Sequence, residues 1–373
     1  MAKFNVALIG CGRISTTHLR AILNHDQEIR LVSVCDLVKE RAELIARKYV
    51  FFAQELGIQT EEPVSYVNYK EMLEKENIDI CSLCTESGYH AKISIDCLKK
   101  GYHVLVEKPM ALSLIDVDNM IKIAQEKNLK LGVCFQNRYN PTIQRLRQAV
   151  IEKRFGKVFG ITARTLWNRN QDYYRKSNWR GTWALDGGCL MNQCIHNIDL
   201  LQWMAPSEIQ SIYGQVRNFL HPYNETEDYA SIIVHFKDGS IGNIEGTVNV
   251  YPKNMEETLT VLGEKGTVVI GGVALNKILF WNFSDQEDSL EEIQQQCNEE
   301  ITNVYGNGHS RVYKDFITSI KNNSRLLIDG VEAKKSLQII LMAYQSQKEN
   351  KPVLYHQDLQ ININDFKGKL KLN

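Results

Sequence analysis

The chain has 373 residues, and Lys+Arg and Asp+Glu are balanced at 44 each. This length suits two domains with separate cores, and the balanced charge gives no indication of a nucleic-acid partner or a membrane surface. No apolar run reaches the roughly 18 residues of a membrane span, and the amino end lacks a signal-peptide pattern. The nine cysteines are scattered and odd in number. This favours reduced thiols, and we expect a soluble cytoplasmic protein.

The first predicted strand, residues 4–9, leads into the turn Gly10-Cys11-Gly12-Arg13-Ile14-Ser15. The turn fits the dinucleotide-binding pattern G-x-G-x-x-G, with Ser at a position that needs only a small residue. Gly10 permits a tight turn, and Gly12 lets the backbone approach a pyrophosphate at the amino end of a helix. The motif alone is weak, because many strand-to-helix turns contain two glycines.

A second predicted strand, residues 31–35, ends at Asp36. An acid about two dozen residues beyond the glycines is where the dinucleotide pattern places the partner of the adenosine ribose hydroxyls. Asp36 would also repel a 2′-phosphate, so the sequence predicts NAD rather than NADP. Lys39 and Arg41 lie close enough to leave NADP as an alternative.

Strands then alternate with helices as far as residue 135, which predicts a doubly wound parallel sheet. Beyond it, a helix at 141–154 is followed by long alternating segments, typical of an open-faced antiparallel sheet with one free face. We therefore predict an α/β protein with an NAD-binding Rossmann domain at 1–135 and an α+β domain at 136–373 for substrate binding and oligomerisation. Within the second domain we expect a surface loop at 285–300 and a helix at 331–348.

The apolar run at 103–106 stops abruptly at Glu107-Lys108-Pro109. Such a run predicts a buried parallel strand, and ligands of open α/β sheets lie just beyond the carboxyl ends of the strands. Lys108 could there exchange a proton with a substrate hydroxyl. A solvated lysine at an ordinary strand end is the alternative. The Lys108–Pro109 bond is one of few that could be cis.

A second candidate group lies on the helix predicted after Gly187-Gly188. Asn192, His196, Asp199 and Trp203 would share one face of a regular helix. His196 suits proton transfer near neutral pH, and Asp199 could orient it. A solvent-facing stripe or a core histidine are the alternatives. No cysteine or second histidine lies at ligand spacing, so we expect no metal there.

Residues 164–183 are crowded with arginine, tryptophan and tyrosine. Arginines bind phosphates bidentately and aromatic rings stack on bases and sugars, so this stretch could bind a nucleotide sugar. The alternative is a rim or interface loop. We single out Arg164, Trp167, Trp179 and Arg180 in this stretch, together with Arg138, as candidate contacts of the diphosphate, sugar and base.

Together, Gly10-Cys11-Gly12, Asp36, the turn 84–90, Glu107-Lys108-Pro109 and the His196-x-x-Asp199 helix resemble the Gfo/Idh/MocA oxidoreductases over essentially the whole chain. The resemblance implies hydride transfer between a sugar or cyclitol carbon and nicotinamide, with Lys108 and His196 acting on the substrate oxygen. It also implies a homo-oligomer, a dimer or tetramer formed through the open sheet. The implied cofactor contacts are Gly10, Gly12, Arg13, Ile14, Asp36, Thr85, Ser87, His90, Glu107, Lys108 and Gln136. The implied substrate contacts are Lys108, Asn137, Arg138, Arg164, Trp167, Trp179, Arg180, Asn192, His196 and Asp199.

Within the family, the segments around 136–141, 179–183 and 191–199 most resemble the WlbA-type enzymes. These oxidise C3 of UDP-N-acetyl-glucosaminuronic acid or a related UDP-N-acetyl sugar on the way to diamino sugars. Two departures matter: Thr85-Glu86-Ser87 replaces the family's T-P-N, and Asn192 stands where inositol-dehydrogenase-like members carry Asp. A ketoreductase, a dehydrogenase of another sugar nucleotide or of inositol, and a non-catalytic dinucleotide sensor are the alternatives.

Overall fold

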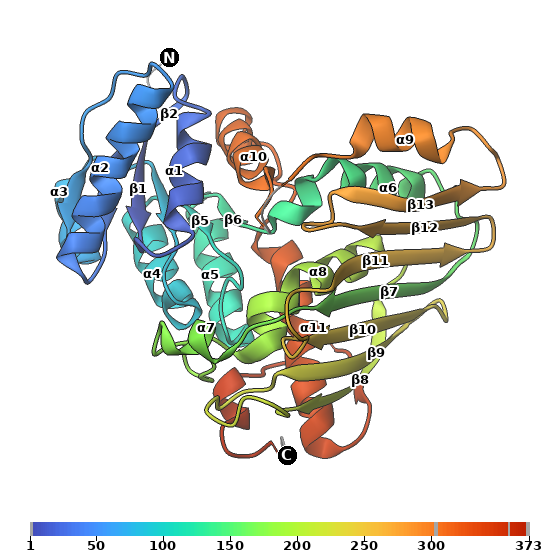
Figure 1. The fold of residues 1–373 in the computed structure, drawn as a ribbon. Coiled ribbons are helices and arrows are strands. Elements are labelled where there is room, and N and C mark those ends of the chain that lie inside the picture. The colour runs from blue at the N-terminus through green and yellow to red at the C-terminus, as the bar shows by residue number, and fades with distance from the viewer. Residues whose placement is uncertain (1–2, 302–304, 357–358, 371–373) are drawn as a thin grey trace. The chain divides into compact units, whose positions relative to one another are not determined.

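A computed structural model describes residues 3–301, 305–356 and 359–370 (Figure 1). The described chain forms two compact units. The first comprises the described residues up to Ala111 together with Asp116–Phe135 and His309–Ala333, and the second comprises Leu112–Ile115, Gln136–Gly308 and the described residues from Lys334 onwards. Among the described residues, no helix combines the length and apolar character of a membrane span.

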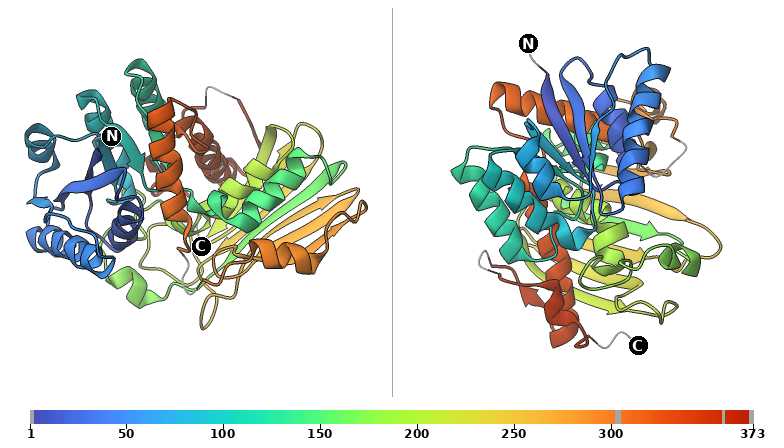
Figure 2. Two further views of the ribbon diagram at one scale, coloured as in Figure 1. Left: turned by 90° about the horizontal axis from the view of Figure 1, so that it is seen from above. Right: turned by 90° about the vertical axis from the view of Figure 1, so that its left-hand side faces the viewer.

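The first unit is built on a six-stranded sheet of order β3-β2-β1-β4-β5-β6, in which all neighbours pair in parallel. Its strands are β1 Phe4–Ile9, β2 Ile29–Cys35, β3 Val64–Tyr66, β4 Ile80–Leu83, β5 His103–Val106 and β6 Leu131–Val133. The helices are α1 Ser15–Leu23, α2 Lys39–Glu55, α3 Tyr69–Lys75, α4 Ser87–Lys100 and α5 Leu114–Glu126, and they lie on both faces of the sheet (Figures 1 and 2). The predicted doubly wound sheet is confirmed. Because this strand order reverses between β1 and β4, the carboxyl ends of these strands are where such sheets bind ligands.

A segment from late in the sequence completes the first unit. Helix α10, Gly308–Asn322, is followed by residues that pair with β6, where Val133 N donates to Ile328 O at 3.3 Å. Phe316 packs so closely on β6 that a Cβ added to Gly132 would lie 2.8 Å from its ring. The prediction placed all of 136–373 in the second domain, and the structure corrects this for His309–Ala333.

The second unit is built on an eight-stranded sheet of order β13-β12-β11-β7-β10-β9-β8-β14 (Figure 1). Its strands are β7 Val158–Leu166, β8 Ile209–Arg217, β9 Tyr229–Phe236, β10 Ile241–Thr247, β11 Glu256–Gly263, β12 Gly266–Gly271, β13 Lys277–Phe283 and β14 Val353–Leu354. The neighbours pair antiparallel except β7 and β10, which are parallel. The sheet is therefore mixed rather than purely antiparallel as expected.

One face of this sheet is covered by helices, and side chains on the other are exposed. Helix α8, Ile195–Met204, packs on β7 and β11. Helix α11, Gly330–Glu349, covers β8, where a Cβ at Gly214 would lie 2.7 Å from Ala343. On the opposite face Ile233 and Ile241 are 39% and 40% exposed. Helix α6 is Pro141–Ile151, and the short elements η1 Gln136–Tyr139, α7 Gln171–Arg175 and η3 Ile363–Phe366 complete the unit.

The predicted loop at 285–300 is wrong, because it contains helix α9, Leu290–Cys297. A capping box begins this helix: Glu292 N donates to Ser289 Oγ at 3.3 Å, and Ser289 N donates to Glu292 Oε2 at 2.8 Å. Ile293 and Cys297 are buried one turn apart. The acidic, glutamine-rich composition hid this short amphipathic pattern, although Ser-x-x-Glu is itself a helix-start signal.

Candidate active site

The glycine turn after β1 has the geometry that a dinucleotide cradle requires. Gly10 has φ of 96°, and a Cβ there would lie 2.5 Å from the carbonyl carbon of Cys84, so both conformation and space demand glycine. At Gly12 a Cβ would meet nothing within 4 Å. The backbone is thus open at Gly12, beside exposed Arg13 and half-buried Ile14 at the start of α1. These residues fit a pyrophosphate held at a helix amino end.

Asp36 accepts a hydrogen bond from the backbone of the glycine turn, and it is also the residue predicted to bind the adenosine ribose. Its Oδ2 accepts from Cys11 N at 2.9 Å, and its Oδ1 accepts from Val38 N at 2.9 Å. A carboxylate has about four acceptor positions, so Asp36 keeps capacity for ribose hydroxyls. The next side chain, Leu37, is 86% exposed and offers no positive charge for a 2′-phosphate.

The turn after β4 is tied to the turn after β5 through His90. Its Nδ1 lies 2.7 Å from Pro109 O, and its Nε2 lies 2.9 Å from Thr85 O. Burial lowers the pKa of His90, against the raising effect of the two carbonyl groups. The His90 ring therefore joins two segments of the predicted cofactor site, while its own contact with the cofactor stays a prediction. Ser87 begins α4 and is buried.

Glu107 and Lys108 follow β5 directly, and the Lys108–Pro109 peptide bond is cis. Glu107 is only 7% exposed, and its Oε1 lies 3.0 Å from His18 Nε2 and 3.1 Å from His309 Nε2. Burial raises the pKa of Glu107, but the hydrogen bonds from these two histidines outweigh it and hold the pKa well below its usual range. The carboxylate is thus charged and buried, and Lys108 is half-buried beside it.

In the second unit, His196 is approached through an unusual helix. The chain passes Gly187 and Gly188, whose φ angles are 85° and 89°, into a π-helical turn, η2 Leu190–Cys194, and only then into α8. The predicted regular helix is therefore wrong over these five residues. π-helical turns occur frequently at functional sites. His196 is the second residue of α8 and is 8% exposed.

The turn before η2 is fixed by buried polar groups. Tyr344 Oη donates to Gly187 O at 2.9 Å, and Glu227 Oε1 accepts from Leu190 N at 2.8 Å. Asn192 Nδ2 donates to Asp186 Oδ1, and Asp186 Oδ2 accepts from Gly181 N at 2.7 Å. Asp186 therefore connects the π-helical turn to the aromatic stretch around Trp179.

Asp199 is bound by Arg138 through two hydrogen bonds. Arg138 Nε donates to Asp199 Oδ2 and Arg138 Nη2 donates to Asp199 Oδ1, each at 2.7 Å. Their side chains are 0% and 1% exposed, and the Arg138 guanidinium lies 4.8 Å from the Trp203 ring. Arg138 and Asp199 thus form a buried, bidentate ion pair, and the substrate contact expected of each stays a prediction.

The side chain of Arg164 points away from α8, although its backbone carbonyl accepts a hydrogen bond from Asn197 Nδ2 at 2.9 Å. Alternation along β7 turns Ala163 and Thr165 toward α8 and Arg164 to the opposite face, where it contacts Glu245 at 3.0 Å and Glu256 at 2.9 Å. The structure thus pairs Arg164 with two carboxylates, and its expected substrate contact stays a prediction.

The other predicted residues of the aromatic stretch lie in the second unit. Trp167 is buried under Arg169, whose guanidinium lies 4.8 Å from its ring. Arg180 lies 4.0 Å from the Tyr173 ring and beside half-buried Trp179. Gln136 and Asn137, in η1, are each 4% exposed, and Gln136 Oε1 and Asn137 Oδ1 have no hydrogen-bond partner among the residues described. Such atoms suit contacts with a bound ligand.

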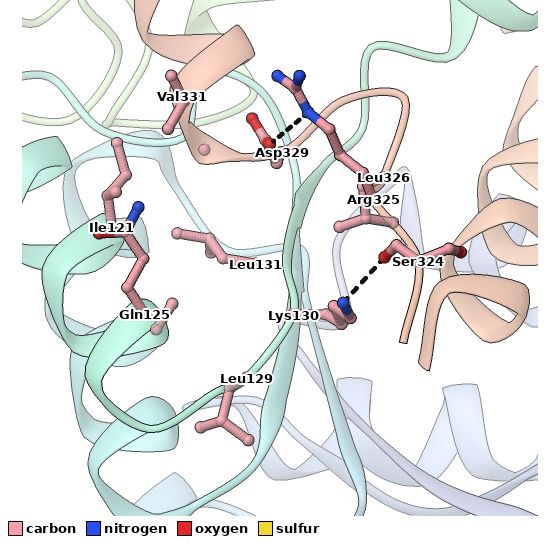
Figure 3. A pocket seen from close by; sticks show the side chains of 12 residues that line it. Ile121, Gln125, Leu129, Lys130, Leu131, Ser324, Arg325, Leu326, Asp329 and Val331 are labelled. Carbon is pink, nitrogen blue, oxygen red and sulfur yellow. Dashed lines mark hydrogen bonds and ion pairs between the residues drawn. The ribbon is translucent and has the colours of Figure 1, made fainter. Parts of the chain in front are cut away.

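A pocket in the first unit lies away from the candidate cofactor residues. It is formed by α5, the start of β6 and the segment 324–331, and Lys130 Nζ donates to Ser324 O at 2.9 Å across it (Figure 3). Lys130 precedes β6, so the pocket is at the amino edge of the sheet, whereas Gly10, Asp36 and Glu107 follow the carboxyl ends of their strands.

The two units match known protein families. Residues 4–135 match a family described as oxidoreductase family, NAD-binding Rossmann fold, and residues 143–269 match the GFO/IDH/MocA C-terminal domain. The fold is similar to that of the WlbA dehydrogenase from Bordetella pertussis in complex with NADH and UDP-GlcNAcA, with 32% identity, a TM-score of 0.82, and coverage of 96% of this chain and 99% of that one. The corresponding Chromobacterium violaceum complex gives 34% identity, a TM-score of 0.83, and coverage of 96% and 97%.

The chain belongs to the Gfo/Idh/MocA oxidoreductase family. Among curated relatives, the myo-inositol 2-dehydrogenase of Thermotoga maritima is 25% identical, over 93% of this chain and 97% of its own length. As a Gfo/Idh/MocA member, the chain is an NAD-dependent oxidoreductase, and the predicted NAD cofactor is confirmed.

Four polar residues that lie around Glu107 in this Gfo/Idh/MocA chain were not singled out from the sequence. His18 and Ser82 lie on predicted elements, but nothing in their spacing pointed to Glu107. His309 and Tyr313 lie on α10, which the sequence did not predict. Their pattern, a histidine and a tyrosine four residues apart before the apolar pair Phe316-Ile317, was the available signal.

Proposed function

We propose that this protein oxidises the C3 hydroxyl of a UDP-N-acetyl sugar, UDP-N-acetyl-glucosaminuronate or a close relative, to the 3-keto sugar. The reaction would be a step toward diamino sugars of surface polysaccharides. Hydride leaves C3 for NAD⁺, the hydroxyl proton passes to a base, and the products are the 3-keto sugar, NADH and a proton. The likeness to two WlbA complexes, at 32% and 34% identity over 96% of the chain, carries this proposal.

In this proposal Lys108 and His196 both act on the hydroxyl that is oxidised. His196 takes the proton, and a cationic Lys108 stabilises the negative charge that develops on the oxygen. Asn192 cannot act as a carboxylate base, and Asp199 is committed to Arg138. The work of proton transfer is thereby left to the lysine and the histidine.

The glycine turn, Asp36 and the turns that carry Thr85, Ser87 and Glu107 would hold NAD, which supplies the hydride acceptor. Gln136 would contribute its unpartnered amide oxygen. Arg13, Ile14 and His90 would support the same region from the start of α1 and from α4. The glycine turn, Asp36, Thr85 and Glu107 follow the carboxyl ends of β1, β2, β4 and β5, where open parallel sheets bind ligands, and this supports the proposed role.

On the substrate side, we propose contacts from Asn137, Asn192, Trp167, Trp179 and Arg180. Arg180 is stacked on Tyr173 at 4.0 Å, which orients its guanidinium and leaves less side-chain entropy to lose on binding a diphosphate. Arg164 is excluded from this proposal, because it lies on the opposite face of the sheet.

The test is a panel of UDP-N-acetyl sugars, UDP-N-acetyl uronates and inositols incubated with NAD⁺ or NADP⁺ and monitored by absorbance of the reduced cofactor. We expect UDP-N-acetyl-glucosaminuronate with NAD⁺ to give the highest kcat/KM. Lys108→Met should lower kcat by about 10²-fold or more while NADH still binds. Retained turnover in Lys108→Met would contradict the role of the lysine, and turnover of inositol alone would contradict the substrate.

Oxidation of an inositol is the second candidate, favoured by the 25% identity to the Thermotoga maritima enzyme over 93% of the chain. Asn192 weighs against it, since inositol-dehydrogenase-like members carry Asp at this position. A chain that binds NADH but turns over nothing in the panel would instead act as a dinucleotide sensor.

We also propose that the protein is a cytoplasmic homo-oligomer, a dimer or tetramer, formed through the exposed face of the second sheet. Exposed Ile233 and Ile241 on neighbouring strands β9 and β10 support this. Light scattering after size exclusion should give a multiple of the 42.8 kDa chain mass. Ile233→Glu should lower that mass, and a monomer in the wild type would refute the interface.

A further inference from the structure

We propose that His309, with His18 and His90, positions the Lys108 side chain by clamping the backbone on both sides of it. We call these three residues the histidine clamp. This inference rests on the proposed catalytic role of Lys108 and extends it to a helix from the far end of the chain. His18, His90 and His309 are 0%, 1% and 3% exposed, so they act on Lys108 through the backbone and not through solvent or substrate.

Upstream of Lys108, the clamp acts through the Glu107 carboxylate. Oε1 accepts from His18 Nε2 at 3.0 Å and from His309 Nε2 at 3.1 Å, while Oε2 accepts from Lys108 N at 3.2 Å. A carboxylate only accepts, so each imidazole donates through Nε2, a tautomer assigned from these partners. Two rings therefore hold the side chain that in turn holds the Lys108 amide.

The two donor rings differ in what surrounds their other nitrogen. His18 Nδ1 lies 2.9 Å from Tyr313 Oη and 3.1 Å from Ser82 Oγ, and either hydroxyl can donate to it. His309 Nδ1 is buried and has no hydrogen-bond partner among the residues that the structure describes. A buried unsatisfied nitrogen costs folding free energy. The His309 ring thus makes its hydrogen bond to Glu107 through Nε2 while its Nδ1 stays buried.

Downstream of Lys108, the clamp acts on the next carbonyl group. His90 lies 2.7 Å from Pro109 O and 2.9 Å from Thr85 O, which ties the chain after Lys108 to the start of α4. The amide of Lys108 and the carbonyl of Pro109 are thus both held by buried groups. Helices α1, α4 and α10 each contribute one ring to this arrangement. A displacement of about 1 Å at a reacting group can cost about 10²-fold in rate.

The test compares three variants of α10 in the full-length protein. His309→Phe keeps an aromatic ring but removes the donor to Glu107, His309→Gln keeps an amide donor, and Ser319→Ala removes a buried hydroxyl on the same helix that contacts Arg325 O. In His309→Phe we expect kcat to fall about 10- to 100-fold, while the KM for NAD⁺ changes less than about threefold. In His309→Gln we expect kcat to recover most of that loss. Ser319→Ala should match the wild type within about twofold.

The pH profile separates positioning from a merely structural role. The titratable groups around Glu107 include His18, His90, His309, Tyr313, Lys108, Cys84 and Cys134. Loss of one histidine donor raises the pKa of Glu107, so the acid limb of kcat should move to higher pH in His309→Phe and return in His309→Gln. An equal loss of thermal stability in His309→Phe and Ser319→Ala, with no change in kcat or in its pH profile, would overturn the proposal.

A readout without substrate distinguishes this proposal from the proposed reaction. When the lysines are labelled with ¹³C-methyl groups, each gives its own NMR signal, and the signal of Lys108 is the one that disappears in Lys108→Met. We expect that signal to shift in His309→Phe and to stay in place in Ser319→Ala, whether or not a UDP-sugar is turned over.

The atoms of His18, Glu107 and His309 that could bind a metal also lie within 4.8 Å of one another, a spacing that a divalent cation can span. Stoichiometric metal in the purified protein that His309→Gln loses would overturn the hydrogen-bonded clamp.

Discussion

Replacing Asp199 tests whether the Arg138–Asp199 pair supports the fold or the chemistry. Asp199→Ala would leave the Arg138 guanidinium buried without the two hydrogen bonds of 2.7 Å that now neutralise it. Each bond to a charged group contributes about 1.5–3 kcal/mol. Breaking a buried pair by removing one partner costs about 3–5 kcal/mol in total. We therefore expect the free energy of unfolding of the second unit to fall by about 3–5 kcal/mol.

The assay uses the protein's own tryptophans. All five, at 167, 179, 183, 203 and 281, belong to the second unit, and Trp203 lies 4.8 Å from the Arg138 guanidinium. Urea unfolding followed by tryptophan fluorescence therefore reports on this unit. The double variant Arg138→Met/Asp199→Leu removes both charges and should recover most of the loss, because apolar replacements of buried pairs are often neutral or stabilising.

Activity measured below the unfolding transition separates the two roles. If the pair is structural, folded Asp199→Asn should keep its kcat within about tenfold of the wild type. A loss of stability below about 1 kcal/mol together with a fall in kcat of about 10³-fold would refute the reasoning and make Asp199 the partner of His196.

Two further predictions concern the glycine turn and a buried acid. Gly10→Ala should unfold the first unit or abolish NADH binding, because the added Cβ would lie 2.5 Å from the carbonyl carbon of Cys84. Gly12→Ala should fold normally, because its Cβ would meet nothing within 4 Å, but it should bind NADH about tenfold more weakly in a fluorescence titration. Equal stability of the two variants would contradict the steric argument. Burial raises the pKa of Glu227 to about 8, so folding favours its protonated form. Its contribution to the free energy of unfolding is therefore complete below the ordinary pKa of a glutamate and declines as pH rises through about 8. Glu227→Gln should therefore be less sensitive than the wild type to a rise from pH 6 to pH 8.5 in urea unfolding, and an unchanged pH dependence would contradict a neutral Glu227.

The parallel sheet was predictable because its signals are local. Gly10, Gly12 and Asp36 lie at fixed sequence distances from two largely buried strands, and most residues of those strands are apolar. The position of a side chain relative to a second element was not predictable in the same way. Arg164 looked like a phosphate ligand from its neighbours, but strand alternation turned it away from α8 toward Glu245 and Glu256.

The helix that carries His196 shows a second limit. A regular spacing put Asn192, His196, Asp199 and Trp203 on one face, but five residues of π-helix change the register. Asp199 is instead paired with Arg138, 61 residues earlier in the chain. The partners of Glu107 were similarly hidden, because His309 lies 202 residues further along the chain. Contacts of this separation depend on tertiary packing, which hydrophobic periodicity does not encode.

The return of His309–Ala333 to the first unit has a consequence for how the protein is made. A ribosome releases the glycine turn, Asp36 and Glu107 early, but the strand neighbour of β6 and the ring of His309 emerge only after strands β7 to β13 of the second sheet have been translated. The nucleotide-binding half is therefore finished late, and a fragment that stops at residue 135 would lack His309, one of the two rings that donate a hydrogen bond to Glu107 after β5. Transplanting this half into another enzyme would require carrying both pieces.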